Sequence, residues 1–186
     1  MSKYKYLLCL SVATVLLSFS SLAAHAAEPK SLEQLLSDLK AAQPENVVTL
    51  EREIERRWSL SGSYSVDLLF QKGEDAFKAK DFEAAIEHFS AVIEFAPEFA
   101  MGWFARSRAF MAVDYDGPAL EDLERALQID AQNYLAILAL AQMFEYLGHS
   151  DLALAAYEEV LNIHPHLNAA RESKARLDSR LADQNI

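Results

Sequence analysis

The sequence FEAAIEHFSAVIEFAP, residues 82–97, sets the architecture because its pattern returns twice, each time after 34 residues. The second copy begins at Asp116 and the third at Ser150. Small and then large apolar residues hold the same places in all three copies: Ala85, Ala119 and Ala153, followed four residues later by Phe89, Leu123 and Tyr157. Self-similarity at a fixed period of this length predicts a solenoid of helical hairpins.

The periodic region divides into three units, residues 66–99, 100–133 and 134–167. Further residues mark shared positions: Gly73, Pro97, Trp103, Phe110, Ala126, Leu127, Ala141, Phe144, Gly148 and Pro165. On these residues the chain resembles the tetratricopeptide repeat (TPR) family, and more narrowly short exported TPR proteins of alphaproteobacteria. It departs from the family pattern at Ala76, Arg106, Ser107 and Ala131. The resemblance implies an all-α fold, a right-handed solenoid of three TPR hairpins with an N-terminal helical hairpin and a C-terminal capping helix.

Residues 1–26 have the layout of a secretory signal peptide. Lys3 and Lys5 precede an apolar, serine-rich run, and Ala24-His25-Ala26 supplies small residues before a cleavage site. The alternative is an uncleaved anchoring helix, but the run is interrupted by polar residues and shorter than the roughly 20 apolar residues that span a bilayer. We therefore predict export to the periplasm, with no stable membrane insertion after cleavage.

Cleavage also changes the composition of the chain. It removes two lysines and Cys9, so the mature protein has 15 basic and 28 acidic residues, a net charge of −13, and no cysteine. Phosphate backbones and anionic bilayer surfaces repel such a chain, which disfavours nucleic-acid binding. The core alone must hold the fold, because no disulfide is available.

Two segments flank the repeats. Residues 27–65 predict a helical hairpin, since Ser31 and Gln34 have the spacing of a capping box and Pro44 separates two apolar stripes. We expect this hairpin to cap the exposed side of the first repeat. Residues 168–186 predict a charged capping helix and tail, in which Ala169, Leu177 and Leu181 face the last repeat. Within the repeats, Asp81 and Asp116 are predicted to cap second helices and Gly148 to end a helix.

No motif in the sequence predicts catalysis, a cofactor or a metal site. The best metal candidate is His164-Pro165-His166, but two imidazoles lack the other donors of a zinc site. We expect alanine at both histidines to leave the melting temperature unchanged. Carboxylate pairs such as Asp122 and Glu124 are predicted to face solvent.

The predicted binding surface is the concave groove, which the TPR resemblance assigns to the first helix of each hairpin. Its expected residues are Phe70, Glu74, Phe77, Met101, Phe104, Arg108, Met111, Leu135, Leu138, Gln142 and Tyr146. Glu74 and Arg108 are placed to face each other on adjacent first helices. The family positions that carry lysine, asparagine and arginine in chaperone-binding members hold Phe70, Glu74, Ala105, Leu135 and Ala139 here, so the carboxylate clamp is absent.

An apolar groove has two interpretations that the sequence leaves open. In the first, the groove receives an amphipathic or extended segment of another protein; in the second, it is ordinary core covered by the N-terminal hairpin. The first interpretation predicts a non-catalytic adaptor or scaffold with a protein or peptide partner. The alternative function is an oligomerising structural or accessory part of a cell-envelope assembly. The oligomeric state is not predicted.

Overall fold

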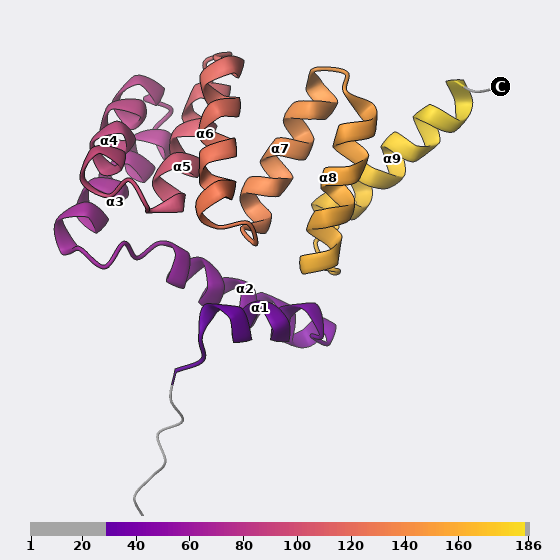
Figure 1. Ribbon diagram of the computed structural model, residues 1–186, viewed down its shortest axis with the longest axis horizontal. Helices are drawn as coiled ribbons and strands as arrows, with labels where there is room; N and C mark the ends of the chain where they lie inside the picture. The colour runs from indigo at the N-terminus through magenta and orange to yellow at the C-terminus, as the bar shows by residue number, and fades with distance from the viewer. Residues whose placement is uncertain (1–28, 185–186) are drawn as a thin grey trace, which may run out of the picture. The chain divides into compact units, whose positions relative to one another are not determined.

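The computed structural model describes residues 29–184, and the predicted signal peptide lies outside them. The described part of the chain contains nine α-helices and no strand, which confirms the all-α fold class (Figure 1). The helices are α1 (Leu32–Lys40), α2 (Pro44–Trp58), α3 (Tyr64–Lys78), α4 (Phe82–Phe95), α5 (Ala100–Met111), α6 (Asp116–Ile129), α7 (Tyr134–Tyr146), α8 (Ser150–Ile163) and α9 (Asn168–Gln184).

Helices α3 to α8 form three antiparallel pairs, α3 with α4, α5 with α6 and α7 with α8, which stand next to one another (Figure 1). Each pair turns through one residue with a left-handed backbone, Lys80, Asp114 or Gly148, with φ of 62°, 59° and 81°. These residues are spaced by 34, like the rest of the repeat. Only the third turn uses glycine, the residue that adopts this conformation without steric cost.

The recurring small residues allow close packing within each pair. Ala85, Ala119 and Ala153 are completely buried, as are the large residues that follow them. Gly73 serves the same purpose on α3, because a Cβ atom there would lie only 2.4 Å from the ring of Phe89. The small residue therefore lets α3 and α4 approach until the aromatic ring fills the remaining space.

Helix starts follow the predicted caps in two of three cases. Ser31 and Gln34 make both hydrogen bonds of the capping box, and the Asp81 side chain accepts from the Ala84 amide. Asp116 was expected to be a cap but is the first residue inside α6; the cap position belongs to Tyr115, whose side chain makes no capping bond. Asp116 instead places a negative charge at the positive end of the helix dipole.

The N-terminal hairpin does not cap the first repeat, so that expectation is wrong. Buried residues of α1 and α2, including Leu39, Ile54 and Trp58, form one cluster with residues of α7, α8 and α9. The Trp58 indole nitrogen donates to the Asp130 carboxylate at 2.8 Å, and its ring packs 5.0 Å from that of Tyr134. The hairpin therefore closes on the third repeat.

Helix α9 covers the last pair, as predicted for a C-terminal capping helix. Leu177 and Ala170 are completely buried against α8, whereas Ala169, expected in this role, is exposed. The buried face is thus shifted by one residue at the start of the helix. Among the described helices, none is long and apolar enough to cross a membrane.

Candidate binding groove

The predicted groove residues lie on α3, α5 and α7, and they divide into two halves. We call the first set the proximal half, because its members lie nearer the starts of the helices: Phe70, Met101, Phe104, Leu135 and Leu138. The second set is the distal half: Glu74, Phe77, Arg108, Met111, Gln142 and Tyr146. All five proximal residues are buried or half-buried, whereas the distal half ends in two exposed side chains, Gln142 and Tyr146.

Phe104 is core rather than an open contact point. It is 6% exposed and belongs to a cluster with Ala119, Leu123 and Met143. These neighbours come from α6 and α7, so the repeats themselves cover the ring and the N-terminal hairpin is not required. Both interpretations of the sequence, an open groove and a groove filled by the hairpin, therefore fail at this residue.

Other residues of the proximal half border the cluster to which the hairpin contributes. Met101, Leu135 and Leu138 pack, partly buried, against the cluster that contains the apolar residues of α1 and α2. The proximal half is thus largely occupied by the protein's own side chains.

The distal half contains the ion pair that the sequence predicted. Arg108 Nη1 lies 3.2 Å from Glu74 Oε1, joining the first helices of two successive repeats. The guanidinium also lies 4.4 Å from the centre of the Phe77 ring. Both charged side chains are partly buried, and the pair neutralises the groove at this point.

A pocket of about 190 Å³ lies at the end of the distal half, between the second and third repeats. We call it the distal pocket; it is lined by Met111, Asp114, Asp116, Gln142, Met143 and Tyr146. Three of these residues were predicted groove residues. The two aspartates were not predicted to lie in the groove. They belong to the turn of the second hairpin, and the positive φ shared by residues 80, 114 and 148 shows that the three turns occupy equivalent positions.

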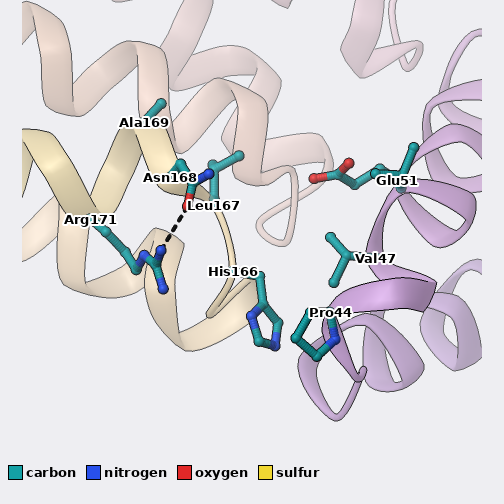
Figure 2. Close-up of a pocket in the computed structure, with 9 residues that line it drawn as sticks. Pro44, Val47, Glu51, His166, Leu167, Asn168, Ala169 and Arg171 are labelled. Carbon is teal, nitrogen blue, oxygen red and sulfur yellow. Dashed lines mark hydrogen bonds between the residues drawn. The ribbon is translucent and has the colours of Figure 1, made fainter.

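A larger cleft of about 520 Å³ lies where α2 meets the turn between α8 and α9 (Figure 2). Pro44, Val47 and Glu51 face His166 and Leu167 across it, and Asn168 accepts a hydrogen bond from Arg171 on the far wall. Sequence reasoning missed this cleft, because it exists only once the hairpin closes on the third repeat.

His164 is a core residue, and its contacts lead us to replace the expected neutrality to mutation with a predicted loss of stability. It is completely buried, its Nε2 lies 2.6 Å from Glu51 Oε1, and its ring meets that of Tyr134 edge-on at 5.0 Å. His166 bonds through Nε2 to the Ala42 carbonyl at 3.0 Å. Both histidines therefore join the hairpin to the repeats. Within residues 29–184 no group of three or more potential metal ligands occurs.

Asp122 was expected to face solvent and is buried instead. Its carboxylate accepts hydrogen bonds from Nε and Nη2 of Arg106, both at 2.8 Å, and Arg106 also donates to Ser90 Oγ at 3.1 Å. The arginine that departs from the family pattern is thus matched by an acid on the next helix. This pair ties α5 to α6 and α4.

The repeats place this chain in a known class of proteins. No family model matches it. A TPR repeat-containing protein of Rhizobium etli is 29% identical over 152 residues, covering 81% of this chain and 74% of the relative. Human serine/threonine-protein phosphatase 5 is 36% identical over 95 residues, which is 51% of this chain but only 19% of the enzyme.

Solved structures agree with the sequence relatives. The first TPR domain of Spaghetti (RPAP3), bound to an HSP90 peptide, superposes with a TM-score of 0.61 at 20% identity, covering 63% of this chain and 93% of that domain. At this identity the likeness concerns the fold alone. With the 34-residue period and the three helix pairs, it shows that the chain has the fold of a tetratricopeptide repeat (TPR) solenoid.

Proposed function

We propose that this protein is an exported, non-catalytic adaptor that binds a segment of another protein in the distal half of its groove. The observation that carries the proposal is the combination of a preformed pocket with an exposed aromatic ring, since Tyr146 is 72% exposed beside the distal pocket. Exposed aromatic residues at the edge of a concave site are typical anchors for a partner chain.

The structural relatives support a peptide as the kind of partner, because the RPAP3 domain was solved with one bound. The mode of binding differs. Where chaperone-binding members are expected to carry basic residues, Phe70, Ala105 and Ala139 are buried apolar side chains and Glu74 is held by Arg108. A grip on a terminal carboxylate is therefore disfavoured at these positions.

Export is the second part of the proposal, and it rests on the signal-like layout of residues 1–26. The mature, acidic and cysteine-free chain suits the periplasm, where solubility matters and no disulfide is needed. Mass spectrometry of the protein from the periplasmic fraction should find Ala27 as its first residue. An intact Met1 in that fraction contradicts cleavage.

Affinity capture from the cell-envelope fraction tests the adaptor role. Tyr146→Asp should reduce the captured partner at least tenfold while helicity and melting temperature stay unchanged, because the side chain is 72% exposed. Phe95→Asp is the matched control, since Phe95 is 68% exposed and lies on α4, outside the pocket. Equal loss with both variants, or loss with neither, contradicts binding at the distal half.

One observation favours the alternative role in an assembly. Tyr64 and Leu68 are both exposed, four residues apart, in the first half of α3. Tyr64 is 83% exposed, and apolar residues at this spacing form one face of a helix. Sedimentation velocity over a concentration series distinguishes the roles: a tight dimer that Tyr64→Asp dissociates favours assembly, and a monomer at all concentrations favours the adaptor.

A further inference from the structure

The charges of the distal half are not equally available to a partner. Glu74 is paired with Arg108, as described above. In the last turn of α7, beside Tyr146, Glu145 accepts hydrogen bonds from Arg176 and Arg180 of α9 at 3.2 and 3.4 Å. These acids are therefore neutralised by cations of the protein's own chain.

Asp114 and Asp116 differ from Glu74 and Glu145 in their ion pairing. Neither carboxylate forms an ion pair with a cation in the described part of the chain, and both line the distal pocket. Arg108 is the cation among the predicted groove residues, but it forms its ion pair with Glu74 and lies over the ring of Phe77. Two carboxylates at one small pocket thus lack a cationic side-chain partner, and their fields add there, although the α6 dipole partly offsets the charge of Asp116.

The rest of the pocket wall suits the stem of a long side chain. Met111 and Met143 offer flexible, polarisable apolar surface, and the exposed ring of Tyr146 offers an aromatic face. Lysine and arginine side chains fit such a wall. Their methylene stems pack on apolar surface, and their charged ends interact favourably with carboxylates or with the face of an aromatic ring.

We propose that the distal pocket receives a lysine or arginine side chain from a segment of the partner protein. This inference rests on the proposed function and deepens it, by naming the chemistry of the anchor. An acidic anchor is repelled by both aspartates. A purely apolar anchor strips water from two carboxylates without replacing their hydrogen bonds, which is unfavourable. The site is thus opposite in charge to a carboxylate clamp.

The test uses the full mature chain and a displayed library of random 12-residue peptides as the probe. Selected peptides should share one basic position next to apolar residues. For a selected peptide, replacing the arginine by citrulline, which keeps the shape and removes the charge, should weaken binding about tenfold. Asp114→Asn with Asp116→Asn should cause a similar loss, and the arginine and citrulline peptides should then bind equally.

The matched control is Glu121→Gln with Asp151→Asn. It changes the net charge equally, both residues are exposed, and Asp151 also lies in the first turn of a helix. The control should leave affinity within twofold. Peptides selected without a basic position, or equal loss in control and pocket variants, overturn the cationic anchor while leaving peptide binding intact. No enrichment over bare resin contradicts the peptide groove itself, and the anchor with it.

Discussion

The buried pair of Arg106 and Asp122 should dominate the stability of the second repeat. Asp122 is 3% exposed and bonded twice to the guanidinium. Asp122→Ala leaves the guanidinium, whose side chain is 19% exposed, without its partner. Breaking one side of such a pair typically costs about 3–5 kcal/mol, mostly because a desolvated charge is left uncompensated. We expect this loss in the free energy of unfolding.

Urea unfolding followed by far-ultraviolet circular dichroism measures the change. The matched control is Glu98→Ala, because the pair of Glu98 with Arg125 has the same 2.8 Å distance but an acid side chain that is 75% exposed. Exposed pairs are worth at most about 1 kcal/mol. Replacing Arg106 and Asp122 together by methionine and leucine should recover most of the loss. If Asp122→Ala costs no more than Glu98→Ala, the pair is not desolvated and the reasoning fails.

Three further predictions concern single side chains. Phe104→Asp should cost at least about 3–5 kcal/mol of unfolding free energy, because it removes a core ring and buries a charge; a loss under about 1 kcal/mol means that the ring is not core. His164→Ala should cost about 2–3 kcal/mol by losing the bond to Glu51, and an unchanged urea midpoint contradicts this. Glu55 is an exposed residue, and partial desolvation of its carboxyl group, and then the charge of Glu51, raises its pKa above the ordinary 4.5. This stabilising preference for the protonated acid is lost as pH rises through the raised pKa, so Glu55→Gln should raise the melting temperature at pH 7 and not at pH 4.

The repeat was predictable because each residue that defines it acts locally. A small residue at Ala85, Ala119 or Ala153 and a large one a turn later pack within one helix pair, so the period alone specifies the pairs. The capping box at Ser31 and the turn at Gly148 are equally local, since their geometry involves residues within one or two turns of a helix.

The position of the N-terminal hairpin was not predictable in the same way. Its apolar stripes fit any apolar surface, and the first repeat is merely nearest along the chain. The contacts that decide its place join distant residues: Trp58 with Asp130, Glu51 with His164, and the carbonyl of Ala42 with His166. No periodic pattern links such residues, because each pair occurs once.

Buried polar residues were misjudged for a related reason. Asp122 and His164 are residue types usually found in contact with water. Asp122 was predicted to face solvent, and His164 was predicted to tolerate replacement by alanine. Each is buried because a specific partner on another helix satisfies it. Arg106 was visible as a departure from the family pattern, and an unexpected arginine in a core position is a signal to search the neighbouring helices for an acid.

The contrast between local and long-range contacts also explains which features of the groove were predictable. Periodicity predicts which face of α3, α5 and α7 points inward, but not how deeply each residue lies. The proximal half borders the apolar cluster to which the hairpin contributes, whereas Gln142 and Tyr146 of the distal half are exposed. Under the proposed function, a partner meets the ends of the first helices and the turns that follow them, where Asp114 and Asp116 lie. Selectivity should depend on turn residues that vary freely between repeats, while the helix faces that carry the family pattern are used to build the core.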